Sequence, residues 1–126
     1  MFIYFFDKKY YDSVSITRYY LLMRVRKDSE TLAAAIFMEF GDYFHYHLSG
    51  SRREFLRLAP NNILLWEAVK YAKMRGCKRI HLGGGLSDIQ EDSLFQFKKK
   101  FSSECKDFYI GKRVHNRDVY KLLIRK

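Results

Sequence analysis

Three apolar segments joined by very short polar turns constrain the fold of this chain most. Residues 21–26 place apolar side chains at every second position, 32–40 is almost wholly apolar, and 43–49 follows the turn Gly41-Asp42. Alternation with a period of two predicts strands, and a continuous apolar run predicts a central strand covered on both faces. Because such short turns join neighbouring antiparallel strands, the sequence predicts an antiparallel meander.

The rest of the chain alternates helical and strand patterns. The expected order is a helix starting at Pro60 and stopping at Gly76, a strand over 79–83, a helix over 88–101, a strand over 105–111, and a helix capped by Asn116. Strands that follow helices can pair in parallel, so the fold class is α+β with a mixed sheet. The length of 126 residues predicts a single domain, residues 1–126.

The charge of the chain is strongly positive. Lysine and arginine outnumber aspartate and glutamate by 24 to 14, which gives a net charge of +10. This balance favours an anionic partner: tRNA, a nucleotide-linked or lipid-linked precursor, or an anionic membrane surface. The basic residues are scattered along the sequence, so charge spread over the surface for solubility is the alternative.

Cysteine usage and hydropathy predict where the protein works. Cys77 and Cys105 form no CxxC motif and are too few for a disulfide framework, which favours a reducing compartment. No apolar run reaches transmembrane length, and Met1–Phe6 is too short for a signal peptide. We therefore expect a cytoplasmic protein, with a peripheral position at the inner membrane face as the alternative.

The stretch from Ile80 to Phe101, IHLGGGLSDIQEDSLFQFKKKF, is the strongest local signal for a site. It runs from a short strand through three glycines, Gly83 to Gly85, to the basic run 98–100. Consecutive glycines let a ligand approach the backbone closely, and lysines attract an anionic substrate. The pattern predicts one wall of an active-site cleft. The alternative is a plain glycine turn before a solvated helix.

An ordered set of motifs covers most of the chain. Its members are HYHLSGS at 45–51, Pro60 with Leu64-Leu65, GCK at 76–78, HLGGG at 81–85, DSLFQFK at 92–98, YIGK at 109–112 and His115-Asn116. From about Tyr19 to Tyr120 this set resembles the Fem-type branch of the GNAT acyltransferases, which includes the aminoacyltransferases of peptidoglycan cross-bridges. The resemblance implies acyl or aminoacyl transfer to an amine in cell-wall or surface-polysaccharide biosynthesis.

The sequence departs from that family at two places. A complete domain of this kind has an extra strand and helices before the meander, so the chain resembles the C-terminal part of one. The segment Ser51–Asn62 reads SRREFLRLAPNN and lacks the GxG with which ordinary members bind the pyrophosphate of coenzyme A. No bound cofactor is expected. Of the two possible donors, the departure favours aminoacyl-tRNA over acyl-CoA.

Lys98 is the first candidate catalytic residue. The pair Phe97-Lys98 matches a site that the resemblance links to acyl transfer or donor binding, and a fixed cation stabilises a tetrahedral oxyanion. The alternative is that residues 98–100 form one solvated basic run. Gly84 and Gly85 join Phe97 as expected substrate-binding residues.

His47 is the second candidate, as the base that accepts a proton from the acceptor amine. The alternative is a half-buried strand whose histidines have ordinary polar partners, and this alternative is preferred for His45. Strict alternation would place His45, His47 and Ser49 on one face of the strand and Tyr46 and Leu48 on the other. Tyr46, Ser49 and Ser51 are the expected substrate-binding residues of this strand. The histidine spacings match no common zinc motif, so no metal site is expected.

A non-catalytic function and an oligomeric state are also predicted. A truncated module that binds RNA or a partner subunit is the alternative function, with Tyr10, Tyr11, Tyr19 and Tyr20 as base-stacking residues. Because the meander would have an uncovered edge, a homodimer is expected, with strand exchange through residues 1–20 as one route. The competing arrangement has residues 1–18 folded back as a helix over the sheet of their own chain.

Overall fold

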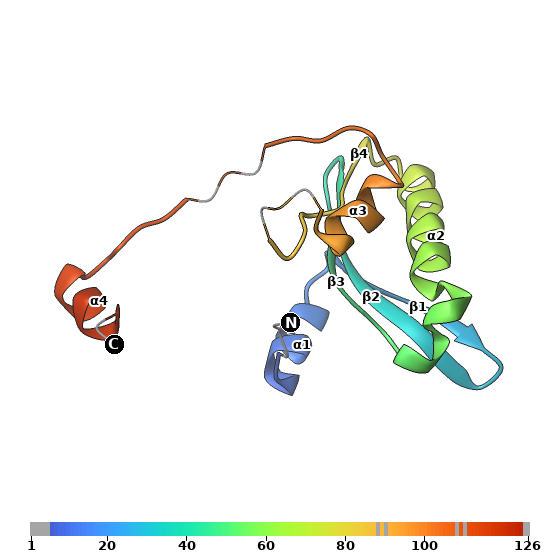
Figure 1. Cartoon of the computed structure of the whole chain (residues 1–126), viewed down its shortest axis with the longest axis horizontal. Coiled ribbons are helices and arrows are strands. Elements are labelled where there is room, and N and C mark those ends of the chain that lie inside the picture. The colour runs from blue at the N-terminus through green and yellow to red at the C-terminus, as the bar shows by residue number, and fades with distance from the viewer. Residues whose placement is uncertain (1–5, 88, 90, 108, 110, 125–126) are drawn as a thin grey trace. The chain divides into compact units, whose positions relative to one another are not determined.

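The computed structural model describes residues 6–87, 89, 91–107, 109 and 111–124 (Figure 1). The chain forms two compact units, Met1–Gly83 and Gly84–Lys126. The first holds the sheet and the second holds most of the glycine-rich stretch, so the predicted site residues are divided between them.

A four-stranded mixed sheet in the order β1-β2-β3-β4 is the centre of the first unit. Its strands are β1 (Tyr20–Lys27), β2 (Glu30–Phe40), β3 (Tyr43–Ser51) and β4 (Arg79–His81). The first three form the predicted antiparallel meander, and β4 pairs in parallel with β3. The predicted fold class is therefore confirmed.

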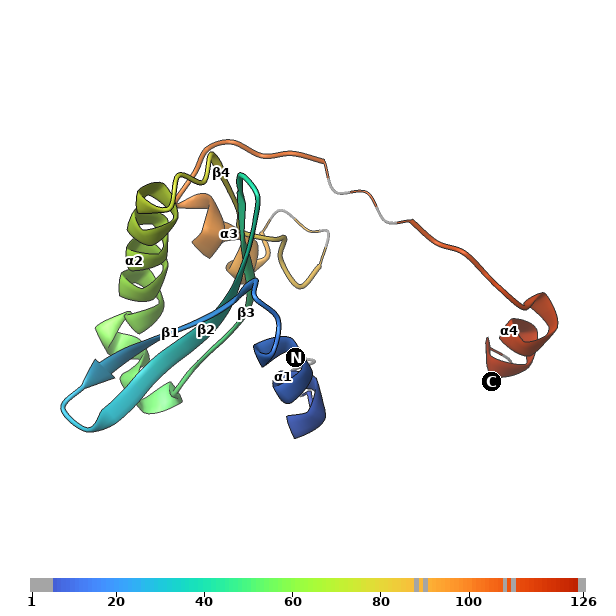
Figure 2. The same ribbon diagram turned by 180° about the vertical axis from the view of Figure 1, so that it is seen from behind.

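The helix α2 (Pro60–Met74) lies along one face of this sheet, as Figures 1 and 2 show from opposite sides. On that face the rings of Phe37, Phe44 and Tyr46 stack, with centroids 5.1 and 5.3 Å from that of Phe37. The apolar stripe of α2 closes this core with the buried side chains of Leu64, Leu65, Ala68 and Ala72. Proline at its first turn and Gly76 with φ of +81° after its last turn set the predicted limits.

A bulge in β3 changes which residues share a face. Tyr46 pairs with Phe37 and Leu48 pairs with Ile36, so His47 is an extra residue opposite β2. One inserted residue inverts the alternation beyond it. Tyr46 and Leu48 therefore lie on opposite faces, and Ser49 lies on the α2 face with Tyr46. The prediction that Ser49 shares a face with the histidines was wrong for this reason.

Two short helices complete the first unit. The helix α1 (Lys8–Ser15) begins at Asp7, whose carboxylate accepts a hydrogen bond from the Tyr10 amide at 2.9 Å. It is the intrachain helix that the sequence analysis gave as the alternative to strand exchange. The 3-10 helix η1 (Arg53–Leu58) occupies the basic stretch between β3 and α2.

The second unit contains α3 (Ser93–Lys99) and α4 (Arg117–Ile124). The carboxylate of Asp92 caps α3, so this helix begins later than the predicted 88; residues 88 and 90 lie outside the described part. Asn116 caps α4 as predicted, with Oδ1 3.1 Å from the amides of Asp118 and Val119. None of the described helices is both long and apolar enough to cross a membrane.

The predicted fifth strand over 105–111 is not found at its described positions, which are 105–107, 109 and 111. Their side chains are exposed, including Tyr109 at 84%. A strand needs a neighbouring strand for its hydrogen bonds and a covered face for its apolar residues, and these positions have neither in the described structure. Residues 108 and 110 lie outside the described part.

Candidate active site

The strands β3 and β4, which carry the histidines, diverge within the sheet. β4 pairs with β3 only from Tyr43 to His45, ending at the pair His45–His81. The segment 47–51 of β3 extends past the end of β4. Backbone groups at such a divergence are open to a ligand in an extended conformation. The bulge at His47 lies immediately beyond this point and turns that side chain away from the regular ladder.

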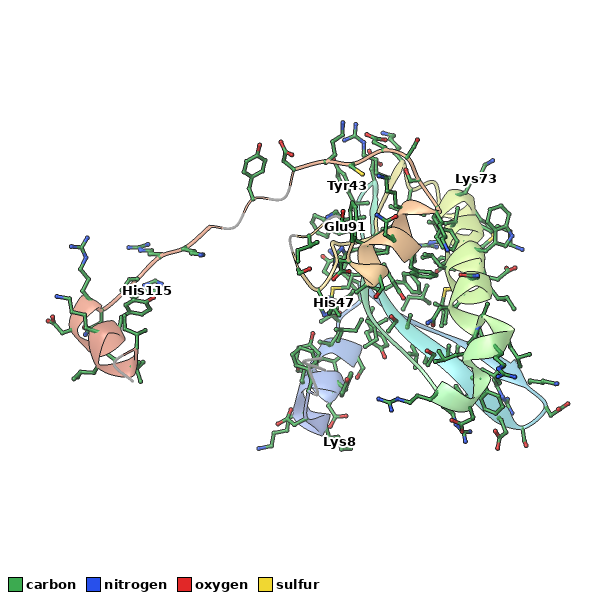
Figure 3. The ribbon with its side chains drawn as sticks, viewed as in Figure 1. Lys8, Tyr43, His47, Lys73, Glu91 and His115 are labelled. Carbon is green, nitrogen blue, oxygen red and sulfur yellow. The ribbon has the colours of Figure 1, made fainter. Side chains whose placement is uncertain are left out.

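Three histidines and a tyrosine meet on the sheet face opposite α2. The Nδ1 atoms of His45 and His81 are 2.9 Å apart, so one donates its proton to the other. The ring of His47 lies 5.8 Å from that of His45. On its other side, Nε2 of His47 is 2.6 Å from the hydroxyl of Tyr10, a residue of α1. Figure 3 shows His47 beside α1.

His47 has the properties of a base. Partial burial lowers the pKa of its imidazole below the usual value, because the charged form loses hydration. The side chain is therefore neutral at pH 7 and has a ring nitrogen able to accept a proton. Among the described residues no group of three or more His, Cys, Asp or Glu is arranged to hold a metal ion.

Tyr46 and Ser49 lie together but apart from this cluster. The Tyr46 hydroxyl donates to Ser49 Oγ at 2.5 Å on the α2 face. Tyr46 is only 5% exposed, and burial raises the pKa of its phenol, an effect that the Ser49 hydrogen bond opposes. Tyr46 is thus a core residue whose hydroxyl reaches the exposed Ser49, which places these two side chains beside α2 rather than beside His47.

Ser51 lies at the start of α2. Asn61 Nδ2 donates to Ser51 Oγ at 3.3 Å, and Asn61 Oδ1 is buried without a hydrogen-bond partner in the described structure. Before the helix, Ala59 has a left-handed backbone with φ of +48° and gives no side-chain cap. First-turn amides left without a side-chain cap are typical of an anion-binding helix start.

In the second unit, Lys98 is tied to the glycine stretch. Its Nζ donates to the Gly84 carbonyl oxygen at 2.7 Å. Burial lowers the pKa of the Lys98 ammonium, and the charge of Asp92 opposes this shift. Phe97 packs against Phe101, with ring centroids 5.5 Å apart. Lys98 is thus held by a backbone contact instead of standing in a solvated run.

Asp92 holds the other end of this loop. Its carboxylate accepts hydrogen bonds from the amides of Leu86 and Phe95, at 3.0 and 2.9 Å, and from Ser87 Oγ at 3.3 Å. The bond from the Phe95 amide is the main cause of a lowered Asp92 pKa. A Cβ on Gly85 would stand 2.6 Å from Asp92 Cγ, so the loop needs glycine at this position.

We expect Gly83→Val to destabilise the protein by about 1–2 kcal/mol, because Gly83 has φ of +74° and a β-branched residue is strained there. From sequence, Gly84→Val was expected to be damaging because a positive φ was assumed at Gly84. That expectation was wrong: Gly84 is not left-handed, and a Cβ there would meet no atom within 4 Å, so Gly84→Val should change stability little. Urea denaturation of both variants measures the difference, and equal losses would contradict it.

Two members of the histidine cluster were not predicted from sequence. Tyr10 was considered as a base-stacking residue, and His81 was considered as part of a motif and as a possible metal ligand. Tyr10 and His47 are 37 positions apart, and His45 and His81 are 36 apart, so no local pattern links them. Predicted strand pairing between residues 43–49 and 79–83 would have been the one available signal.

Comparisons with known proteins identify the family and the fold of the chain. Residues 11–99, more than half of the chain, match a family described as "Acetyltransferase (GNAT) domain". No curated protein matches the chain. A solved structure, the ribosomal-protein-S18-alanine N-acetyltransferase from Escherichia coli, has a similar fold, with a TM-score of 0.62 at 17% identity. The match covers 74% of this chain but 59% of that enzyme.

Proposed function

Because the chain belongs to the acetyltransferase (GNAT) domain family, we propose that it transfers an acyl group from acyl-CoA to an amine. The observation that carries this proposal is His47, a neutral imidazole bonded to Tyr10 beside the divergence of β3 and β4. In the reaction the amine nitrogen forms a bond to the acyl carbon and the carbon–sulfur bond breaks. His47 accepts the proton that the attacking nitrogen loses, and coenzyme A leaves as its thiolate.

The start of α2 supports acyl-CoA as the donor. The family resemblance places the pyrophosphate of coenzyme A at this segment. Although GxG is absent, the left-handed Ala59 and the uncapped first turn supply an equivalent helix start for a phosphate. Arg53 and Arg57 of η1 add positive charge nearby in the sequence. This reverses the expectation from sequence that aminoacyl-tRNA is the better donor.

Membership of the family indicates an amine acceptor, and the proposed acceptor is a narrower class. We keep an amine of a cell-wall or surface-polysaccharide precursor, as the Fem-type resemblance implies, and the net charge of +10 suits the anionic carriers of such precursors. Acetyl-CoA and aminoacyl-tRNA are therefore tested side by side. Purified chain is incubated with each donor and with amine acceptors that do or do not carry a diphosphate, and release of thiol or tRNA is measured.

Transfer from acetyl-CoA that is lost in His47→Ala supports the proposal. Transfer only from aminoacyl-tRNA would replace the donor and restore the Fem-type assignment. No transfer from either donor would contradict the proposal for this chain. Binding of tRNA that weakens steeply between 50 and about 200 mM salt would then favour the non-catalytic RNA-binding module.

The homodimer predicted from sequence is retained as a proposal. Large apolar side chains remain exposed on the first unit: Ile16 at 85%, Phe40 at 67% and Leu22 at 53%. Exposed large apolar side chains of this kind can contribute to an interface between subunits. Light scattering at low micromolar concentration should give twice the chain mass of 15.2 kDa, and a monodisperse 15.2 kDa species would contradict the dimer.

A further inference from the structure

We propose that the outer edge of β1 binds an extended acidic segment of another polypeptide, which joins the sheet as an additional strand. β1 is a terminal strand of the sheet, and β2 is its one neighbour in the described structure. It is eight residues long, which exceeds the usual length of an unprotected edge strand. Its outward amides and carbonyls from Tyr20 to Val25 form a regular template for β-augmentation, and a register shift follows between Val25 and Arg26.

The charge along this edge selects the partner. Arg24, Arg26 and Lys27 are exposed, and none forms an ion pair with a described carboxylate. Other basic residues of the same unit are paired, as Arg52 is with Glu30 at 3.0 Å. A second copy pairing through β1 would add three more cations to the same edge and increase its positive charge. An acidic segment would neutralise them.

A cleft at the start of β1 supplies a specific contact. It has a volume of about 340 Å³, and its walls include Arg18, Tyr20, Glu39, Tyr71 and Arg75. The guanidinium of Arg75 is already held by Glu39, with Nη2 3.0 Å from Oε1. Arg18 is bonded to the Tyr19 hydroxyl at 2.8 Å and has no described carboxylate partner. Its orientation is thus fixed while its charge remains available for a carboxylate.

The two faces of β1 predict the pattern of the bound segment. Leu21, Met23 and Val25 face α2, whereas Leu22 and Arg24 occupy the opposite face. Residues opposite each other on neighbouring strands share a face, so the segment should alternate apolar and acidic side chains. Its acidic residues lie on the Arg24 face, and an acidic end reaches the cleft at Arg18.

Two synthetic peptides are the probes. One is the acidic peptide Thr-Glu-Val-Glu-Val-Glu-Thr-Glu, and the other has lysine in place of each glutamate. Fluorescence anisotropy measures binding to the whole chain, and hydrogen exchange locates it. We expect the acidic peptide alone to bind and to protect outward amides of β1. Arg24→Glu and Arg18→Glu should each weaken binding about tenfold or more, because each places a carboxylate next to a glutamate of the peptide and the two repel.

The matched control is Lys121→Glu, which makes the same change in net charge on α4 of the second unit, outside the sheet's own strands. It should bind the acidic peptide as the unchanged chain does. The proposal is overturned if both peptides bind equally, if neither protects β1, or if Lys121→Glu weakens binding as much as Arg24→Glu. It is also overturned if β1 amides become protected as the concentration of the chain alone rises, because a second copy then occupies the edge.

Discussion

Replacing His47 with alanine should lower the rate of acyl transfer about 100-fold or more, the usual contribution of a positioned general base. The imidazole lies beside the divergence of β3 and β4 and is neutral at pH 7 because burial lowers its pKa. Alanine removes the proton acceptor without touching the stacked core on the α2 face. Steady-state rates with acetyl-CoA measure the effect, and circular dichroism checks that the variant folds.

The pH profile distinguishes a base from a structural residue. Since the neutral form of His47 is the active one, activity should fall as pH decreases through its pKa, which lies below the ordinary 6.5. The acid limb of the profile should therefore lie below pH 6.5 and should be missing from the residual activity of His47→Ala. An unchanged acid limb in that variant would contradict the assignment.

Tyr10→Phe is the companion change. It keeps the ring, which stacks on Phe6 with centroids 4.1 Å apart, and removes the hydroxyl that lies 2.6 Å from His47 Nε2. Without this hydrogen bond the imidazole is less well oriented, so we expect a smaller loss of rate than in His47→Ala and a shifted acid limb. A wild-type profile in Tyr10→Phe would show that the hydrogen bond does not position the base.

The meander and α2 could be predicted from sequence because their signals are local. Alternating side chains, turns of two residues, and a proline at a helix start act over a few positions. The bulge at His47 could not be predicted, because one inserted residue leaves the composition of the strand unchanged. Its consequence is large, since it moves Ser49 from the histidine face to the Tyr46 face.

Contacts between distant residues account for the rest of what was missed. Two such contacts, Tyr10–His47 and His45–His81, form because α1 and β4 lie next to β3 in the fold. No short sequence motif predicts either contact. The glycine stretch was recognised, but only backbone angles and neighbouring atoms separate its members: Gly83 is left-handed, Gly84 is a hydrogen-bond acceptor, and Gly85 leaves room for Asp92.

Replacing Lys98 with methionine should lower acyl transfer by about 100-fold to 1000-fold, the range for removing a group that stabilises the oxyanion. Methionine keeps most of the apolar stem and deletes the ammonium that bonds the Gly84 carbonyl oxygen at 2.7 Å. Loss of that contact should cost about 1 kcal/mol of stability, more than a solvated lysine would. Rates at saturating acetyl-CoA, together with urea denaturation, separate the two effects.

Lys99→Met is the matched control, because Lys99 is exposed and its ammonium lies 6.0 Å from the Phe95 ring, with no hydrogen bond to the described residues of the loop. It should leave rate and stability nearly unchanged.

In the unchanged chain, activity that requires the charged ammonium should decline as pH rises through the Lys98 pKa, which burial places below the usual 10.5. A loss of stability in Lys98→Met with full activity would make Lys98 a purely structural residue of the glycine loop. A loss of activity that Lys98→Arg largely restores would instead assign the effect to the positive charge.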